Sequence, residues 1–478
     1  MDGIMWGNVI AGLLYTVYLA IVVATIFIVI FDNRNPVKTM AWILVLFFLP
    51  VAGLLLYIFF GRDTRKERLI SRKGYARLAK RPMEEYQAQA EVAVEAGQKH
   101  LATFFRRVNN ALTFGGNGVE FYTNGYAMVQ SLLREIARAR KFIHMEYYIF
   151  EDDAIGRLVR DALIDKAREG VRIRVLYDDV GCWKVDHDFY EQMLCEGIEV
   201  QSFLKVRFPR FTSKVNYRNH RKLTIIDGHT GFIGGMNIAE RYVKGLPWGP
   251  WRDTQAKITG KAVYGLQTAF LTDWYAVDRS LITSAEYFPK IKERQGDTVA
   301  QIVTSDPVGQ WHDIMQGLMM AVCSARRYLY IQTPYFLPDE QIKTALQTAA
   351  LAGTDVRIML PKRADTWLIH KASLSYLSEM MCAGVKIYLY RKGFIHAKMM
   401  VYDDEVATVG STNMDFRSFE HNFEANTFFY DRQTALTLKT VFLDDQRNCL
   451  LLSPKIWERR SWRNKATESV VRLLAPLL

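Results

Sequence analysis

The chain has 478 residues and a formal net charge of +12, and half of its residues are hydrophobic. This length allows two or three domains with filled cores, and the positive charge indicates an anionic partner, either nucleic acid or an acidic membrane surface. The five cysteines lie far apart, without the spacing of a metal site or a disulfide framework. We therefore expect no metal, no disulfide and a reducing, cytosol-facing environment.

Two hydrophobic stretches open the chain, at residues 9–31 and 39–60, and neither carries a formal charge. Each is long enough to cross about 30 Å of hydrocarbon as a helix, so we predict a transmembrane hairpin over residues 1–60. A cleaved signal peptide is the alternative for the first stretch, but Asp2 makes its start acidic and no A-x-A cleavage site follows. The predicted hairpin favours a membrane as the anionic partner.

The second stretch contains Pro50 and Gly53, which are expected to kink the helix or to turn it into a re-entrant segment. Residues 61–81 follow with nine Lys or Arg against two acidic residues, a net charge of +7. A basic cluster beside an apolar segment obeys the positive-inside rule and attracts anionic lipid, although an ordinary solvated helix has the same composition. We therefore predict a multi-pass protein of the inner (cytoplasmic) membrane whose catalytic part is cytoplasmic.

Residues 82–114 are polar and rich in Ala, Glu and Gln, which indicates a helical linker. Two similar regions follow, and in each the hydrophobic pattern predicts helices that alternate with strands. The predicted helices span residues 126–140, 155–169 and 341–352, with another ending near 326, and the predicted strands span 142–149, 171–177, 328–332 and 356–360. This alternation is typical of α/β units built on a sheet.

One short motif occurs twice in the same register, with every paired position 176 residues apart. A single copy would be weak evidence, but duplication in register is not an accident of composition. Flanking sequence repeats as well, since KFIHMEYYIF (141–150) echoes RYLYIQTPYF (327–336), so the chain contains two copies of a unit of about 180 residues. The copies of the motif are His220-x-Lys222-x4-Asp227 and His396-x-Lys398-x4-Asp403, each followed by a Gly-rich turn that ends at Asn237 or Asn413.

The residues of the motif can support phosphodiester chemistry. Residues i and i+2 of a strand share a face, so each histidine points the same way as the lysine that follows it. Two lysines (Lys222 and Lys398) and two asparagine amides (Asn237 and Asn413) can neutralise a phosphodiester without a metal ion. One histidine can then attack phosphorus while the other protonates the leaving oxygen, which is covalent catalysis through a phosphohistidine.

The remaining motif residues have two possible roles each. Asp227 and Asp403 complete the motif, and we count them with both histidines and both lysines as catalytic candidates. Both end predicted strands, so bracing the fold is the alternative role. An Asn that follows Gly can simply shape a turn, which is the alternative role of Asn237 and Asn413.

The duplicated motif resembles the HKD motif of the phospholipase D superfamily. Within it, the order of hydrophobic hairpin, basic linker, two HKD domains and RLLAPLL end is similar to the bacterial cardiolipin synthases over essentially the whole chain. The resemblance implies an α/β fold with two duplicated phospholipase D-type sandwich domains that share one active site, preceded by the transmembrane hairpin. The expected domains are residues 1–60 (hairpin), 61–117 (basic then polar linker), 118–296 (first HKD domain) and 297–478 (second HKD domain with a basic and apolar tail).

The resemblance also implies roles for two carboxylates. A nucleophilic histidine needs an acceptor at its other ring nitrogen. In superfamily members, carboxylates at such positions contact the histidines across the two halves, so Glu424 would orient His220 and Asp253 would orient His396. A surface salt bridge is the alternative for both. His220 is the expected nucleophile on the resemblance alone.

The resembled family condenses two phosphatidylglycerol molecules into cardiolipin and glycerol. It implies a phosphatidyltransferase that binds phosphatidylglycerol and other anionic phospholipids and needs no cofactor. A phospholipase D or a phosphatidylserine synthase would use the same site with water or serine as acceptor. A superfamily nuclease would need a nucleic-acid groove and no membrane anchor, and a non-enzymatic scaffold would tolerate a damaged motif. We therefore expect no nucleic acid partner, and the sequence leaves the oligomeric state open.

Two further stretches mix basic and aromatic residues. Residues 205–218 interleave five basic with three aromatic residues, which suits a lipid interface better than nucleic acid beside a membrane anchor, with a solvated loop as the alternative. Residues 457–478 mix basic residues with Trp462 and end in RLLAPLL. This tail is expected either to lie on the membrane or to pack as a terminal helix.

Overall fold

The structure is a computed structural model of the chain. By its internal contacts the chain forms two compact units, one with the N-terminal helices and one with both copies of the motif, and each is described by itself. The described residues are 2–31, 36–57, 86, 89, 91–206, 216–282 and 284–475. The predicted basic run at 61–81 and most of the basic, aromatic stretch at 205–218 lie outside these ranges.

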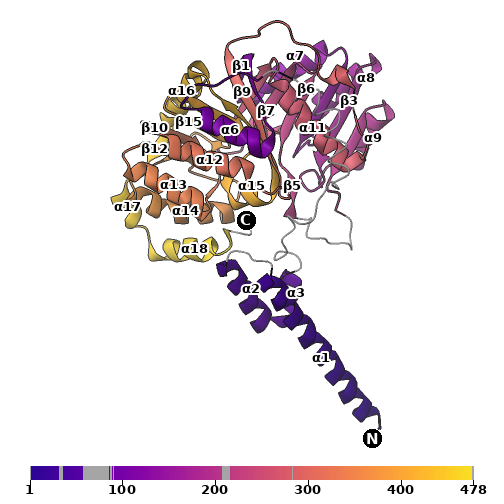
Figure 1. The fold of residues 1–478 in the computed structure, drawn as a ribbon, viewed down its shortest axis with the longest axis vertical. Coiled ribbons are helices and arrows are strands. Elements are labelled where there is room, and N and C mark those ends of the chain that lie inside the picture. Colours follow the sequence, from indigo (N-terminus) through magenta and orange to yellow (C-terminus); the bar gives the residue numbers. More distant parts are fainter. Residues whose placement is uncertain are drawn as a thin grey trace. The chain divides into compact units, whose positions relative to one another are not determined.

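The N-terminal unit is built from α1 (Asp2–Phe31), α2 (Pro36–Phe48) and α3 (Pro50–Leu56) (Figure 1). Within α1, residues 9–31 have a mean hydropathy of 2.7 and are long enough to cross a membrane. The second predicted span is not one helix in the described chain, because it is interrupted between α2 and α3.

Proline causes this interruption. Pro50 has no N–H to give to a preceding helical turn, but it fits the first turn of a new helix, where α3 begins. A Cβ on Gly53 would lie 2.7 Å from the carbonyl oxygen of Val45, so the glycine allows α3 to approach α2 closely. Whether the second stretch crosses the membrane stays a prediction.

The first repeat contains a sheet that runs β4–β3–β2–β6–β7–β8–β1. Strands β2, β3 and β4 are parallel, and the other neighbours in this order are antiparallel. The strands are β1 (Thr113–Asn124), β2 (Phe142–Tyr147), β3 (Arg172–Asp178), β4 (Glu199–Phe203), β5 (Arg218–Asn219), β6 (Lys222–Ile226), β7 (Thr230–Gly234) and β8 (Trp251–Thr259).

The second repeat has the same topology with one strand added, in the order β19–β13–β12–β10–β15–β16–β18–β9. Strand β9 also pairs with β1, which joins the sheets of the two repeats. The strands are β9 (Thr298–Ser305), β10 (Tyr328–Gln332), β11 (Phe336–Leu337), β12 (Asp355–Pro361), β13 (Lys386–Tyr390), β14 (Phe394–Ile395), β15 (Met399–Tyr402), β16 (Val406–Gly410), β17 (Met414–Asp415), β18 (Asn422–Phe429) and β19 (Cys449–Leu451). The duplication seen in the sequence is therefore a duplication of structure.

Helices cover both sheets, as expected for α/β units (Figure 1). Apolar residues of α11 and α16 join strand residues of both repeats in one continuous core, while the other large helices form a separate core in each repeat. The helices are α6 (Lys99–Asn109), α7 (Gly125–Arg138), α8 (Ala154–Arg168), α9 (His187–Cys195), α10 (Arg241–Lys244), α11 (Val263–Asp278), α12 (Asp313–Ser324), α13 (Glu340–Leu351), α14 (Trp367–Cys382), α15 (Phe416–Glu420), α16 (Arg432–Gln446), α17 (Pro454–Glu458) and α18 (Trp462–Arg472).

Candidate active site

Each motif histidine is held by a strand of the other repeat. Two-residue strand β5 pairs in parallel with β18, and the next residue, His220, donates its backbone N–H to the carbonyl of Phe423 at 2.9 Å. In the same way β14 pairs with β8, and His396 donates its backbone N–H to the carbonyl of Arg252 at 2.6 Å. The backbone thus ties the two motifs into one site.

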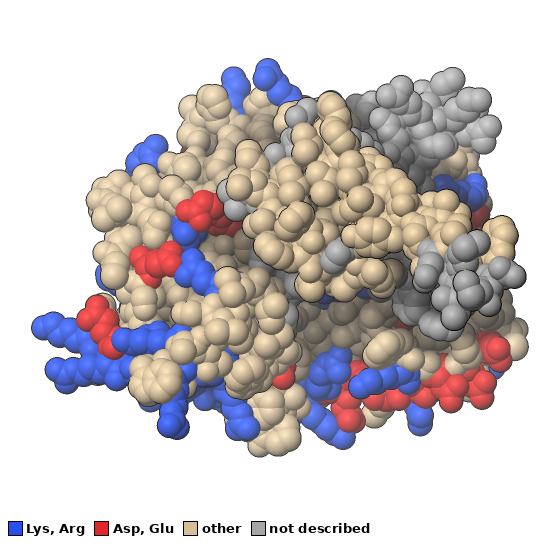
Figure 2. All heavy atoms as spheres, turned by 90° about the horizontal axis from the view of Figure 1, so that it is seen from below, with Lys and Arg blue, Asp and Glu red and all other residues tan. Residues whose placement is uncertain are grey.

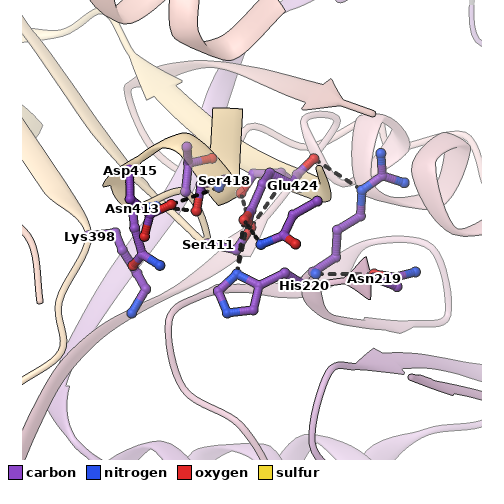
Figure 3. Close-up of polar contacts among 12 residues, drawn as sticks. Asn219, His220, Lys398, Ser411, Asn413, Asp415, Ser418 and Glu424 are labelled. Carbon is purple, nitrogen blue, oxygen red and sulfur yellow. Dashed lines mark hydrogen bonds and ion pairs between the residues drawn. The ribbon is translucent and has the colours of Figure 1, made fainter. Parts of the chain in front are cut away.

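This crossing brings a carboxylate to each imidazole. The residues after Phe423 and Arg252 are Glu424 and Asp253, both fully buried. Nδ1 of His220 lies 3.0 Å from Glu424 Oε1 (Figure 3), and Nδ1 of His396 lies 2.7 Å from Asp253 Oδ2. These are the two pairs named from the sequence, and their role in orienting the histidines stays a prediction.

Both carboxylates are charged despite their burial. Burial alone would raise the pKa of Glu424, but its pairing with His220 and the charge of Lys222 outweigh burial and lower that pKa. Burial would likewise raise the pKa of Asp253, but Lys398 and His396 lower it below its ordinary value. Each carboxylate can therefore accept an Nδ1–H and stabilise a positively charged imidazole.

The two carboxylates are supported differently. The hydroxyl of Ser411 donates a hydrogen bond to Glu424, and the side-chain amide of Asn422 donates another at 3.1 Å. At the position equivalent to Ser411 stands Gly235, where a Cβ would lie 2.2 Å from Asp253 Oδ1. The two equivalent positions therefore differ, since Ser411 supports its carboxylate with a hydrogen bond while position 235 has no room for a side chain.

Both motif lysines are buried beside the histidines. Lys222 donates to the carbonyl of His220, and its Nζ lies 5.2 Å from the ring centre of Tyr148. Nζ of Lys398 lies 2.8 Å from Nδ1 and 3.0 Å from Nε2 of His396. Burial lowers the pKa of Lys398 to about 8 and takes the pKa of Lys222 well below its ordinary value.

Burial also controls the histidines. It lowers the pKa of His220 to about 4, partly opposed by Glu424, and with the charge of Lys398 it lowers the pKa of His396 to about 3. Both imidazoles are therefore neutral at neutral pH before substrate binds. A neutral imidazole is the form that can attack phosphorus.

Both histidines open into one cavity of about 390 Å³, a volume within the range of small-molecule sites. Figure 3 shows His220 of the first repeat facing the segment of the second repeat that carries Lys398, Ser411 and Asn413. The cavity is lined by Tyr148, Ile149, Arg218, His220, Asn237, Arg241, Tyr242, Leu246, Trp251, Tyr335, Asp365, Ile369, His396, Asn413, Asp415, Arg417 and Asn422.

The two predicted asparagines line this cavity but are bound differently. Asn237 accepts the backbone N–H of Ile149 at 3.0 Å and donates to the hydroxyl of Tyr242 at 2.6 Å. Among the described residues, the amide oxygen of Asn413 is buried without a hydrogen-bond partner. The hydrogen bonds of Asn237 fit its alternative role, which is to shape the turn. Phosphate binding by either amide stays a prediction.

Asp227 and Asp403 do not line the cavity. Asp227 accepts the backbone N–H groups of Arg140, Lys141 and Phe142 at 2.7–3.0 Å. Asp403 accepts those of the equivalent segment, residues 326–328, at 2.6–2.9 Å. Both aspartates have a positive φ, 51° and 54°, at the turn that ends the motif strand. This geometry supports bracing, the alternative role that the sequence offered for them.

Sequence reasoning missed several residues of the cavity wall, notably the arginines and Asp415. Burial raises the pKa of Asp415 to about 6. Arg241 and Arg417 carried a signal that the motif analysis did not use, since they are 176 residues apart and each follows its motif asparagine by four positions. Within the described residues, no group of three His, Cys, Asp or Glu side chains is placed to hold a metal ion.

Two intertwined repeats with one shared pair of HKD motifs define a phospholipase D-like protein. A family model described as "Cardiolipin synthase, PLD-like domain" matches residues 132–246 and 318–446, and one for a phospholipase D-nuclease N-terminal region matches residues 20–62.

Known relatives narrow the class further. The cardiolipin synthase of Geobacillus kaustophilus is 38% identical over 99% of this chain and 95% of its own length, and the major cardiolipin synthase of Bacillus subtilis is 39% identical over 98% and 100%. A crystal structure of phosphatidylserine synthase from Haemophilus influenzae covers 79% of this chain and 99% of its own with a TM-score of 0.62, and at 16% identity it shows the fold alone. The chain belongs to the cardiolipin synthase family of phospholipase D-like proteins.

Proposed function

We propose that this cardiolipin synthase transfers a phosphatidyl group from one phosphatidylglycerol to another, which gives cardiolipin and glycerol. Membership of the family supports the reaction. The observation that carries the mechanism is the crossed pairing of His220 with Glu424 and of His396 with Asp253 around one cavity.

In the first step, Nε2 of His220 attacks the phosphorus of the donor lipid. The bond from phosphorus to the glycerol oxygen breaks, and His396 gives that oxygen a proton. Glu424 accepts the Nδ1–H of His220 and stabilises its positive charge. The products are a phosphatidyl-histidine and free glycerol.

The proton that His396 needs is close at hand. Free His396 is neutral at neutral pH because burial and Lys398 lower its pKa to about 3, but the ammonium of Lys398 lies 3.0 Å from its Nε2. Lys398 and His396 together hold one proton below about pH 8. An anionic phosphodiester beside His396 favours transfer of this proton from Lys398 to the imidazole. Lys222 and the proton shared by Lys398 and His396 oppose the charge of the phosphate, and no step requires a metal ion.

In the second step, a second phosphatidylglycerol enters. His396, now neutral, takes the proton from its primary hydroxyl, the oxygen attacks phosphorus, and the bond between phosphorus and His220 breaks. Cardiolipin leaves, His396 returns its proton to Lys398, and both imidazoles are neutral again. The same groups would activate water or serine, so the acceptor that enters the site determines which reaction takes place.

We also propose that the N-terminal unit anchors the enzyme in the inner membrane with its catalytic unit in the cytoplasm. Residues 9–31 support an anchor by their length and hydropathy. Figure 2 shows Lys and Arg side chains in groups along the lower part of the face in view, together with Asp and Glu.

The test is to incubate the membrane-embedded protein with phosphatidylglycerol and identify the lipid products. Cardiolipin and an equal amount of glycerol are expected, also in the presence of a strong chelator. His220→Ala and His396→Ala should each abolish both products, because the two histidines act as one unit. Phosphatidic acid as the main product would show a hydrolase and contradict the proposal.

A further inference from the structure

Two arginines stand at equivalent places in the two repeats. Arg241 and Arg417 are separated by the 176 residues that separate the motif histidines, and both line the cavity. Arg241 opens the short helix α10 and Arg417 lies in the short helix α15. These helices precede β8 and β18, the strands whose carboxylates cross to the histidine of the other repeat.

The crossing places the two guanidinium groups at different histidines. Cζ of Arg241 lies 5.9 Å from the ring centre of Trp251, and that ring lies 5.3 Å from the imidazole of His396. Arg417 lies in α15, which leads directly into β18 and so to Glu424, the partner of His220. Burial raises the pKa of Tyr148 and the charge of Arg417 opposes that rise, and the Tyr148 ring lies 5.0 Å from the imidazole of His220. Arg241 therefore belongs to the His396 end of the cavity and Arg417 to the His220 end.

The proposed reaction needs a second phosphate site. The donor phosphate is bound at the two histidines, but the acceptor is also a phosphodiester, and its own phosphate is three glycerol carbons from the hydroxyl that attacks. A guanidinium binds such a phosphate through two parallel hydrogen bonds. Without a cation at that place, two negative phosphates would have to approach each other in a partly buried cavity.

The direction of the chemistry selects one of the two arginines. Attacking and leaving groups lie roughly in line on opposite sides of phosphorus. If His220 holds the phosphatidyl group, both the departing glycerol and the incoming hydroxyl are on the side of His396. We propose that Arg241 binds the phosphate of the acceptor phosphatidylglycerol and so selects an anionic lipid alcohol over water; this rests on the proposed function.

The ion pair of Arg241 with Glu151 does not prevent this. Arg241 Nη1 lies 2.9 Å from Glu151 Oε2, and the two side chains are 32% and 36% exposed. Such a pair is weak, and it leaves other N–H groups of the guanidinium for a phosphate. It also holds the guanidinium in place before the acceptor arrives.

The test compares an anionic with a neutral acceptor. Full-length protein in phosphatidylglycerol vesicles is supplied with ethanol, and cardiolipin and phosphatidylethanol are measured together. Arg241→Gln should lower the ratio of cardiolipin to phosphatidylethanol about tenfold. The change removes a charged hydrogen-bond donor to the phosphate of phosphatidylglycerol, whereas ethanol has no phosphate to bind. Arg241→Lys should recover part of the ratio.

Two control variants complete the design. Arg417→Gln should lower both products by a similar factor and leave their ratio unchanged. Arg417 lies at the His220 end of the cavity, where the phosphatidyl group is held whichever acceptor attacks it. Arg157→Gln removes an arginine of α8 that is 59% exposed and paired with Asp152, and it controls for the loss of one positive charge.

An unchanged ratio in Arg241→Gln would overturn the proposal, and so would a fall in the ratio caused by Arg417→Gln instead. A wild-type protein that makes phosphatidylethanol but no cardiolipin would contradict the proposed function itself.

Discussion

Ser411 and Gly235 occupy equivalent positions but support different carboxylates. Ser411→Ala removes the hydroxyl that donates to Glu424. Because that hydrogen bond helps to keep the pKa of buried Glu424 low, we expect turnover to fall about tenfold while the melting temperature changes little.

The reciprocal change should be more damaging. In Gly235→Ser the new Cβ meets Asp253 at 2.2 Å, so the carboxylate has to leave His396. We expect a larger loss of cardiolipin formation than in Ser411→Ala, measured on membranes with equal amounts of folded protein. Full activity of Gly235→Ser would contradict the asymmetry of the two supports.

The pH dependence of the reaction follows from the buried bases. Burial lowers the pKa of Lys398 to about 8, so the proton that the Lys398 and His396 pair holds is present below this pH and is lost above it. Burial lowers the pKa of His220 to about 4, so this nucleophile stays neutral until strongly acidic pH. We expect kcat/KM to fall as pH rises through about 8 and to show little loss between pH 7 and 5.

This profile is checked on detergent-solubilised protein whose fold is followed by circular dichroism at each pH. Undiminished activity at pH 10 in folded protein would argue against the proton held by this pair.

Among individual residues, the sequence predicted those that lie close together in one short motif. The motif is visible because its histidine, lysine and asparagine are close in sequence and duplicated. The pairs formed by His220 with Glu424 and by His396 with Asp253 span 204 and 143 residues, and only the resemblance to a family suggested them. The wall residues Arg241 and Arg417 share the 176-residue spacing of the motif, but their place at the cavity depends on how the fold positions α10 and α15.

Among the elements, strong hydrophobic periodicity gave close boundaries. The helix predicted at 341–352 is α13 at Glu340–Leu351, and the strand predicted at 328–332 is β10 with the same bounds. The two-residue strands β5 and β14 were not predicted, because each exists only through its pairing with the other repeat.

The linker shows that composition alone does not predict where helices and strands begin and end. Residues 82–114 were predicted to be helical, but in this segment the structure has α6 at Lys99–Asn109, and β1 begins at Thr113. The predicted start of the first HKD domain, residue 118, falls within β1, while the predicted start of the second, residue 297, falls just before β9. Strand β1 pairs with both β8 and β9, and this long-range pairing is not visible in the composition of the segment.

The aspartate at the turn that ends each motif strand is expected to stabilise the fold. Asp227→Asn weakens an acceptor of three backbone N–H groups at the start of β2. We expect it to lower the free energy of unfolding by about 1–3 kcal/mol while the activity per folded molecule is largely kept. Thermal unfolding of Asp227→Asn and Asp403→Asn, with exposed Glu405→Ala as a control, checks this. A fully folded but inactive Asp227→Asn would instead support a catalytic role.

For the whole molecule, two exposed tryptophans follow equivalent strands of the repeats. Trp183 comes shortly after β3 and is 75% exposed, and Trp367 comes shortly after β12 and is 61% exposed. Trp183 follows Cys182, which contacts the carbonyl of Tyr148, and Trp367 lies two residues from Ile369. Tyr148 and Ile369 both line the cavity, so we expect both tryptophans to lie near its mouth.

Tryptophan prefers the boundary between lipid and water. We expect the double change Trp183→Ala with Trp367→Ala to lower cardiolipin formation on vesicles several-fold, and to lower hydrolysis of a short-chain soluble phosphodiester much less. The same change at exposed Trp462 of α18 separates a role at the mouth from a general effect of surface tryptophans. Equal losses on both substrates would count against lipid contact at the mouth.

The crossed pairing of the repeats also governs when the enzyme becomes reactive during its synthesis. A ribosome-bound chain that ends before β14 and β18 has His220 without Glu424 and Asp253 without His396. Contacts over such sequence distances form late in folding. A growing chain already inserted in the membrane through α1 would therefore be surrounded by its own substrate while it lacks the paired imidazoles that cleave it.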